Sequence, residues 1–292
     1  MERDLLSIDD LTPGELGMLL DLSYKVKAQP GDYAGRLAGR SVALIFEKPS
    51  TRTRVSFETG VHELGGHPLV LRSGELQLSR GESIRDTALV LGRHVAAIGI
   101  RTGPDADVEQ LAEHATVPVV NMLTAGHHPC QALADLQTLQ ERFGRLEGLK
   151  LAYVGDGNNV ARSLAILGQR AGVEVAVASP PGYELERVAD AQLTNDPVAA
   201  VAGAHAVYTD VWVSMGDEDT AGERRAALGP YRIDDTLLDH AADGAIALHC
   251  LPAHPGEEIT ESVLYGPRQA IWHQAENRRH AQKALLELLL SG

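Results

Sequence analysis

The stretch Ser41-Val42-Ala43-Leu44-Ile45-Phe46-Glu47-Lys48-Pro49-Ser50-Thr51-Arg52-Thr53-Arg54 decides the fold of this chain. Its beginning is an apolar run, which predicts a short buried strand. Phe57, Val61 and Leu64 then recur at helical spacing. Ser50 is therefore predicted to be the N-cap of a helix of roughly fourteen residues. A buried strand followed directly by a capped helix is typical of an α/β domain with a parallel sheet.

The start of this helix also indicates an anion site. Backbone N–H groups, the hydroxyls of Ser50, Thr51 and Thr53, and the guanidinium of Arg52 come together at the positive end of the helix dipole. Such a group of donors holds a phosphate by several charge-assisted hydrogen bonds. The alternative is an ordinary capped helix with solvated arginines, because Ser and Thr are common at helix starts.

Composition limits the function classes. The chain has 292 residues, 44% of them apolar, so it is long enough to form two domains, each with a buried core. Its formal charge of −14 disfavours binding to nucleic acid or to an anionic membrane. Met1–Asp4 lacks the features of a signal peptide, which makes the cytoplasm the expected location. Cys130 and Cys250 lie far apart, as expected of reduced thiols, and the twelve histidines show no metal-ligand pattern.

Predicted strands and helices alternate in two groups, which indicates two α/β domains, each a parallel β-sheet flanked by helices. A helix over 130–143 is predicted to connect them. The strands are predicted at 42–46, 68–71, 96–100 and 117–121 in the first group, and at 150–154, 173–177, 206–208 and 245–248 in the second. Gly155-Asp156-Gly157 follows a strand, but the next glycine position of a dinucleotide motif is Val160, so nucleotide binding is disfavoured.

Six segments together resemble the aspartate and ornithine carbamoyltransferase family. The segment around Ser50 resembles the family's carbamoyl phosphate signature, and the others follow in the family's order over nearly the whole chain. They are Glu47 to Arg54, His128-Pro129-Cys130-Gln131 with Ala134-Asp135, Gly155 to Asn159, Asp210 to Gly216, His249 to Ala253, and Ala275 to Arg278.

The resemblance implies a carbamoyl phosphate-binding domain over 1–123, completed by a C-terminal helix at 273–292 that folds back onto it. It implies an ornithine-binding domain over 124–272, with the site in the cleft between the two. The expected reaction transfers the carbamoyl group of carbamoyl phosphate to the δ-amine of L-ornithine, giving L-citrulline and phosphate. No metal or organic cofactor is expected.

The resemblance also assigns roles to individual residues. Arg101, His128 and Cys250 are the expected catalytic residues, with His128 beside the carbonyl oxygen. The residues expected to bind carbamoyl phosphate are Ser50, Thr51, Arg52, Thr53, Gln77, Arg101, His128, Gln131, Cys250, Leu251 (through its carbonyl) and Arg278. Those expected to bind ornithine are Asn159, Asp210, Ser214 and Met215.

Gln77 lies in a polar segment that resembles the family loop reaching into a neighbouring subunit's site, which implies a homotrimer or a multiple of trimers. An unpartnered surface loop is the alternative.

Two segments depart from the family pattern. Thr124 to His128 carries an extra histidine and glycine, and the loop after Met215 is polar and shorter. Because that loop closes over ornithine in the family, a different amine, such as an N-acylated ornithine or a diamine, remains an alternative. A catalytically silent paralogue is a second alternative, against which Arg52, His128, Gln131, Cys250 and Arg278 argue.

Overall fold

A computed structural model describes residues 4–214 and 216–291. The chain divides into two compact units, of which the second is Thr138–Ala275 and the first contains the remainder. Both divisions fall inside helices, α5 (Pro129–Phe143) and α11 (Ile271–Leu290). The boundary predicted from the sequence lies earlier, before residue 124. The sequence shows the loop that precedes α5, but it does not show that the first turns of α5 pack with the first unit.

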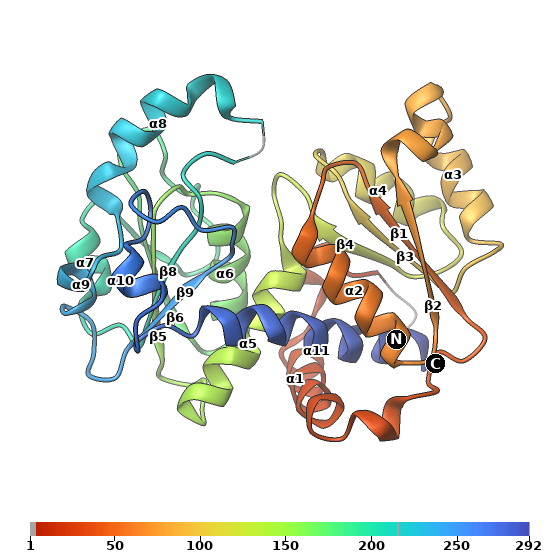
Figure 1. The fold of residues 1–292 in the computed structure, drawn as a ribbon, viewed down its shortest axis with the longest axis horizontal. Helices are drawn as coiled ribbons and strands as arrows, with labels where there is room; N and C mark the ends of the chain where they lie inside the picture. Colours follow the sequence, from red (N-terminus) through yellow and green to blue (C-terminus); the bar gives the residue numbers. More distant parts are fainter. Residues whose placement is uncertain (1–3, 215, 292) are drawn as a thin grey trace. The chain divides into compact units, whose positions relative to one another are not determined.

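The first unit contains a four-stranded sheet in the order β2-β1-β3-β4, and every strand pair is parallel (Figure 1). One face of the sheet packs on α3 and α4 through an apolar cluster that includes Ile45, Ile98 and Leu111. The strands are β1 (Ser41–Phe46), β2 (His67–Arg72), β3 (Ala97–Arg101) and β4 (Val119–Leu123). The helices are α1 (Pro13–Ala28), α2 (Thr51–Glu63), α3 (Ile84–Leu91), α4 (Asp105–His114) and the short 3₁₀ segments Ile8–Asp10, Pro30–Tyr33, Ser73–Glu75 and Gln77–Arg80.

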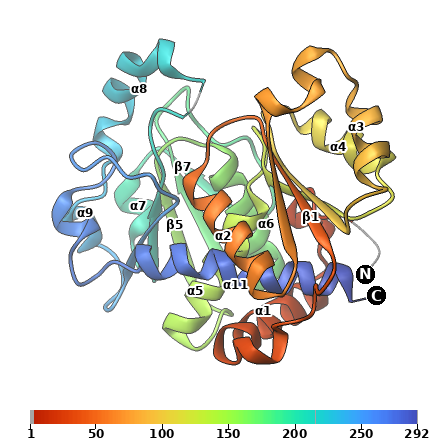
Figure 2. The same cartoon turned by 45° about the vertical axis from the view of Figure 1, so that its right-hand side comes forward.

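The end of the chain belongs to this first unit. Helix α1 and the C-terminal part of α11 lie side by side in both views (Figures 1 and 2). Lys27 Nζ donates to Asn277 Oδ1 at 2.7 Å, and the fully buried Lys283 donates from Nζ to Glu63 Oε2 of α2 at 2.7 Å. These contacts attach a segment distant in sequence to the face of the sheet that carries α1 and α2.

The second unit contains a five-stranded parallel sheet in the order β7-β6-β5-β8-β9. Alternate strand residues face opposite clusters: Tyr153 and Tyr208 pack with α6, whereas Ala152 and Val207 pack with α7, α9 and α10. The strands are β5 (Lys150–Val154), β6 (Glu174–Ala178), β7 (Gln192–Thr194), β8 (Ala206–Thr209) and β9 (Ile246–His249). The helices are α6 (Asn159–Ala171), α7 (Pro197–Val201), α8 (Ala221–Leu228), α9 (Asp235–Leu238), α10 (Glu261–Leu264) and the 3₁₀ segments Glu218–Thr220 and Gly229–Tyr231.

The predicted fold class, two domains with parallel sheets flanked by helices, is confirmed. All eight predicted strands are present with small shifts at their ends, and β7 is an additional strand that was not predicted. Its three residues, Gln192-Leu193-Thr194, are too few to show a period.

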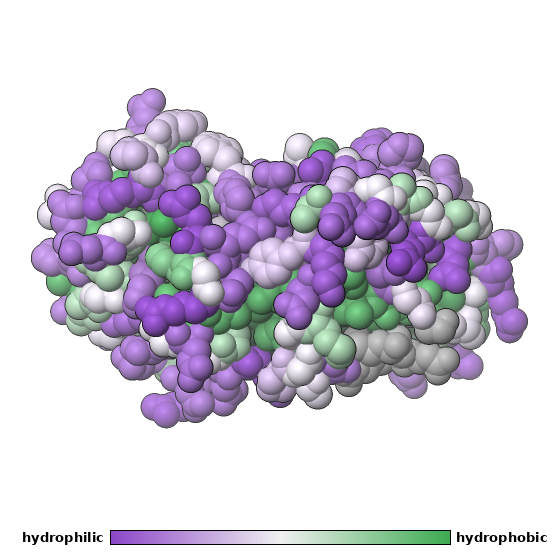
Figure 3. All heavy atoms as spheres, turned by 90° about the horizontal axis from the view of Figure 1, so that it is seen from below, coloured by the Kyte–Doolittle hydropathy of each residue, from purple (hydrophilic) through white to green (hydrophobic). Residues whose placement is uncertain are grey.

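The surface is largely polar, as the charge of −14 suggests. Figure 3 shows hydrophilic residues over most of the face seen from below, with smaller apolar areas between them. Within residues 4–214 and 216–291, none of the helices has the length and apolarity needed to cross a bilayer.

Candidate functional site

The carboxyl edge of the first sheet carries most of the predicted phosphate-site residues. Arg101, the last residue of β3, is the register partner of Phe46 at the end of β1 and of Leu123 at the end of β4. The loops that follow these strands therefore leave the sheet at one edge, where open parallel sheets bind ligands. A backbone bond from Glu47 N to the Arg101 carbonyl at 3.0 Å holds two of these loops together.

Helix α2 begins as predicted. Ser50 is its N-cap and accepts a hydrogen bond from Thr53 N at 3.3 Å on its Oγ. The helix then runs for 13 residues without an acidic residue in its first turn. Its positive end is therefore not neutralised by the helix itself, which suits an incoming anion.

A chain of buried hydrogen bonds connects three elements of the first unit. Arg278 of α11 donates from Nη2 to Thr53 Oγ1 at 2.8 Å and from Nη1 to Gln131 Oε1 at 3.1 Å. Gln131 in turn donates from Nε2 to Asp135 Oδ1 at 2.9 Å. All four side chains are at most 3% exposed. The fold thus brings together residues that the sequence places 225 positions apart.

His128 lies in the same electrostatic environment. Burial of its ring holds the pKa of His128 well below the usual histidine range, and the positive charges of Arg278, Arg101 and Arg52 lower it further. The imidazole is therefore neutral near pH 7 and can donate one N–H to an oxygen without carrying a charge. Three cations around a neutral donor favour a ligand that is strongly anionic.

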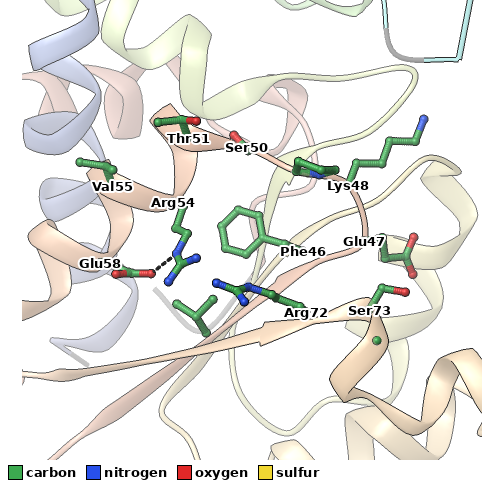
Figure 4. Close-up of a pocket in the computed structure, with 13 residues that line it drawn as sticks. Phe46, Glu47, Lys48, Ser50, Thr51, Arg54, Val55, Glu58, Arg72 and Ser73 are labelled. Carbon is green, nitrogen blue, oxygen red and sulfur yellow. Dashed lines mark hydrogen bonds and ion pairs between the residues drawn. The ribbon is translucent and has the colours of Figure 1, made fainter.

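A cavity of about 690 Å³ opens beside the start of α2 (Figure 4). Of the predicted residues, it is lined only by Ser50 and Thr51, so it adjoins the phosphate site without containing its buried part. Arg54 pairs with Glu58 at 2.5 Å on its wall, and Figure 4 shows the guanidinium of Arg72 on the same side of the cavity. The remaining lining residues are Phe46, Glu47, Lys48, Pro49, Val55, Val70, Ser73 and Gly74.

The second sheet presents an equivalent edge. Thr209 at the end of β8 is the register partner of His249 at the end of β9, so Asp210 and Cys250 leave neighbouring strands side by side. Both side chains are buried, with 7% and 8% exposed. Burial raises the pKa of the Tyr153 hydroxyl, near the end of β5, and the charge of Asp210 raises it further.

Asn158 connects Asp210 to helix α6. Its Nδ2 donates to Asp210 Oδ2 at 3.0 Å, while its Oδ1 accepts from Val160 N and Ala161 N as the helix N-cap. Burial raises the pKa of Asp210 above the usual aspartate range, partly offset by His249. A buried carboxylate with a raised pKa is stabilised in its ionised form when a cationic group binds beside it. Asn159, the predicted residue, follows as the first residue of α6.

The loop after β8 is held by Arg224 of α8. Its guanidinium donates to the Trp212 carbonyl at 2.8 Å, pairs with Asp156, and lies 3.3 Å from Asp217 Oδ2. It also lies 5.1 Å from the centroid of the Tyr183 ring. One cation thus fixes both ends of the segment that contains Ser214. Met215 lies outside the described residues.

The backbone after β9 is equally constrained. Leu251 has φ of 63°, in the left-handed region, and its N–H donates to His249 Nδ1 at 2.7 Å. Because Nδ1 accepts, Nε2 carries the proton and donates to Glu258 Oε1 at 3.0 Å. These bonds orient the carbonyl group of Leu251, which the sequence predicted as a ligand.

Donor atoms of His254, Glu257 and Glu258 lie within 4.8 Å of one another. However, Glu257 pairs with Arg225 at 3.0 Å and Glu258 bonds to His249. We therefore assign these groups to the protein's own hydrogen-bond network.

Both cysteines are free thiols, as expected. Cys130 is completely buried in α5 and its Sγ lies 3.5 Å from the Asn121 carbonyl oxygen. Burial raises the pKa of Cys130 to about 12, so this thiol is chemically inert. Cys250, at the sheet edge, is the cysteine beside the predicted amine residues.

Several residues of these networks were not predicted. Asn158 could have been recognised as a polar residue directly before a helix, and Asp135 as the residue one helical turn after Gln131. Arg224 and Glu258 have no such local signal, because their partners come from other loops.

Comparison with known proteins divides the chain into two domains at nearly the same place as the structure does. Residues 3–141 match the family model for the aspartate/ornithine carbamoyltransferase carbamoyl-P binding domain, and residues 147–289 match the Asp/Orn binding domain. The chain belongs to the aspartate/ornithine carbamoyltransferase family. Within this family it is 54% identical to the ornithine carbamoyltransferase of Acidothermus cellulolyticus, over 99% of this chain and 97% of that protein.

Solved structures of ornithine carbamoyltransferases have the same fold as this chain. The ornithine carbamoyltransferase of Pyrococcus furiosus superposes with a TM-score of 0.95 at 47% identity, covering 100% of this chain and 98% of that one. The Thermus thermophilus ornithine carbamoyltransferase gives 0.92 at 44% identity, covering 98% of each chain.

Proposed function

We propose that this protein transfers the carbamoyl group of carbamoyl phosphate to the δ-amine of L-ornithine, producing L-citrulline and phosphate. The observation that carries the proposal is the neutral, buried His128 among Arg52, Arg101 and Arg278. A dianionic acyl phosphate needs this combination, because cations bind the phosphate and an uncharged donor stabilises the oxyanion. The names of the relatives support the same activity.

In this proposal the phosphate binds at the start of α2. The hydroxyls of Ser50, Thr51 and Thr53 and backbone N–H groups of the first helical turn donate to it, and Arg52 and Arg101 neutralise its charge. Thr53 Oγ1 accepts from Arg278, which leaves its hydroxyl proton to donate to the ligand.

The carbamoyl group lies beside His128. Gln131 Oε1 and the Leu251 carbonyl accept hydrogen bonds from its NH₂ group, and Arg278 lies next to its oxygen. Among the described residues, no hydrogen-bond partner is found for the buried Arg278 Nε, so this N–H can serve the substrate. The acceptors thereby distinguish a carbamoyl group from an acetyl group of the same shape.

The amine substrate binds at the second sheet edge. Asp210 pairs with its α-ammonium group, and Asn159, Ser214 and Met215 supply further polar contacts. The δ-amine has a pKa of about 10.4 by analogy with lysine, so roughly 1 in 2,500 molecules is neutral at pH 7, a cost of about 4.6 kcal/mol. Cys250 contacts the δ-nitrogen and favours its neutral form.

The neutral amine attacks the carbonyl carbon and forms a C–N bond. The carbonyl oxygen becomes negative, accepts from His128, and then re-forms the double bond as the C–O bond to phosphate breaks. The attacking nitrogen gives one proton to an oxygen of the departing phosphate, which therefore leaves as the dianion HPO4²⁻ into the site that held it. No metal or organic cofactor takes part, and the cytoplasm is the proposed location.

Residues 1–123 and the C-terminal helix 273–292 would form the carbamoyl phosphate-binding domain. The ornithine-binding domain would comprise 124–272. Carbamoyl transfer requires groups from both to act on one pair of substrates.

A screen of amines with carbamoyl phosphate tests the proposed substrate. We expect L-ornithine to be used at least about 100-fold better, by kcat/KM, than N-acetylornithine, which lacks the α-ammonium group that Asp210 binds, and better than putrescine, which lacks the α-carboxylate. Phosphate release and formation of the ureido product are the measurements. Preference for N-acetylornithine would contradict the assignment of Asp210, and no turnover with any amine would support a silent paralogue.

We also propose that the active form is a homotrimer or a multiple of trimers, in which Gln77 of one subunit completes the carbamoyl phosphate site of its neighbour. Two features support this. Gln77 is exposed on the short segment Gln77–Arg80. The cavity beside Ser50 and Thr51 is open to solvent, and Val55, one of its lining residues, is 58% exposed. A projecting segment and an open cavity on one unit suit a heterologous ring contact.

Mixing two variants tests this assembly. Gln77→Ala and Arg52→Ala proteins are each expected to be nearly inactive. After subunit exchange, about a quarter of the sites in randomly mixed trimers combine an intact Arg52 with an intact Gln77 of the neighbour, so activity should return to about that level. Exchange demonstrated by mass spectrometry without recovery would place Gln77 outside the shared site.

A further inference from the structure

Gln131 has only one orientation of its side-chain amide that satisfies its neighbours. Arg278 offers only donors, so the atom facing it must be the oxygen, and the 3.1 Å contact is to Oε1. The carboxylate of Asp135 offers only acceptors when ionised, so the atom facing it must be nitrogen, and the 2.9 Å contact is from Nε2. After a half-turn of the amide, its NH₂ group would face the donors of Arg278, and its oxygen would face the carboxylate of Asp135.

This orientation is decided at a buried position inside the helix. Asp135 lies one turn after Gln131 on α5, and both side chains are at most 1% exposed. A buried carboxylate is costly unless it is hydrogen-bonded or close to a cation. Helix α5 therefore contains an acidic residue whose position is explained better by a polar network than by core packing.

We propose that Asp135 is a positioning residue that selects the acceptor face of Gln131 for the carbamoyl NH₂ group. This inference rests on the proposed function, in which Gln131 accepts from that group. With Asp135 in place, Oε1 is held beside Arg278 and keeps a second lone pair for the substrate. Without Asp135, only the bond from Arg278 resists a turn of the amide, so the side chain more often presents N–H groups, which cannot bind an NH₂ donor.

Three ligands separate positioning from a general structural role. Carbamoyl phosphate has the NH₂ group, acetyl phosphate has a methyl group in its place, and inorganic phosphate has neither. In Asp135→Leu we expect carbamoyl phosphate binding, measured by calorimetry, to weaken about tenfold, the loss of one buried hydrogen bond. Acetyl phosphate and inorganic phosphate should change less than about twofold. The ratio of the two acyl phosphate affinities is thus the decisive quantity.

Leu136→Ala is the matched control, because Leu136 is a buried neighbour on the same helix with no polar contact. We expect it to lower the melting temperature and to leave the ligand ratio unchanged. An equal loss of all three ligands in Asp135→Leu would overturn the inference, as would an unchanged ratio in a folded protein. Failure of the unsubstituted protein to bind inorganic phosphate would instead contradict the proposed function.

A pair of substitutions keeps the test decisive when Asp135→Leu does not fold. Gln131→Glu places two carboxylates in contact and should impair carbamoyl phosphate binding strongly. Adding Asp135→Asn supplies an N–H donor to the new carboxylate, so the double variant should bind at least about tenfold better than Gln131→Glu alone. Additive effects of the two substitutions would show that the side chains do not act as a pair.

Discussion

His128→Ala should lower kcat by about 100- to 1,000-fold, the range for loss of one oxyanion donor. Burial and three arginines keep the pKa of His128 low, so the ring acts as a neutral donor whose contribution is greatest when the carbonyl oxygen becomes negative. The loss should therefore appear mainly in kcat, with a smaller change in the binding of inorganic phosphate. Steady-state kinetics and calorimetry on the same preparation measure the two effects.

His127→Ala is the control for this experiment, since it makes the same change at the adjacent residue. We expect its kcat to stay within about threefold of the unsubstituted value, because His127 is not among the residues that we place at the substrates. Near-normal turnover in a folded His128→Ala protein would mean that another group stabilises the oxyanion.

Asp210→Asn should reduce kcat/KM for ornithine by about 100- to 1,000-fold, because removing one partner of a buried charge pair costs about 2–5 kcal/mol. Carbamoyl phosphate binding should hardly change, since that ligand is held by other residues. Asp217→Asn is the control, as Asp217 is a partly exposed carboxylate of the same loop, paired with Arg224. Equal losses for both substrates would identify Asp210 as a structural residue.

The pH dependence of this variant is a further part of the same prediction. Burial raises the pKa of Asp210 in the folded protein, so its ionised form is disfavoured by folding. The stability that protonation contributes is present below the unfolded pKa and is lost as pH rises through the folded pKa. At neutral pH, Asp210→Asn should therefore be at least as stable as the unsubstituted protein while being far less active. As pH decreases through the raised pKa, ornithine use should fall more steeply than protonation of the δ-amine alone explains, and this additional fall should be absent in the variant.

Much of the fold could be predicted because its helices and strands follow from short-range sequence patterns. The apolar run before Ser50, the helical spacing after it, and the N-cap itself are all short-range features, and α2 begins where they place it. Strand β7 was missed because three residues with two polar side chains show no pattern, and it forms only because β6 offers an edge to pair with.

The candidate site could be predicted in part. Residues that end a strand or begin a helix, such as Arg101, Asp210 and Cys250, are found at the two sheet edges where the motifs place them. The residues that hold them could not be found in the same way. Arg224 fixes the loop after β8 from a helix of its own, and Glu258 reaches His249 across nine positions.

The local sequence supplies the reactive groups: hydroxyls and an arginine at a helix start, a histidine before a second helix, and an aspartate and a cysteine after two strands. Tertiary structure alone decided which state each group adopts. His128 is neutral because packing removes water and places Arg278, Arg101 and Arg52 around it, and Gln131 faces one way because Arg278 and Asp135 flank it. The physical reason is that a pKa or an amide orientation depends on charges and donors within a few ångströms, and in this chain those neighbours come from segments up to 225 residues apart.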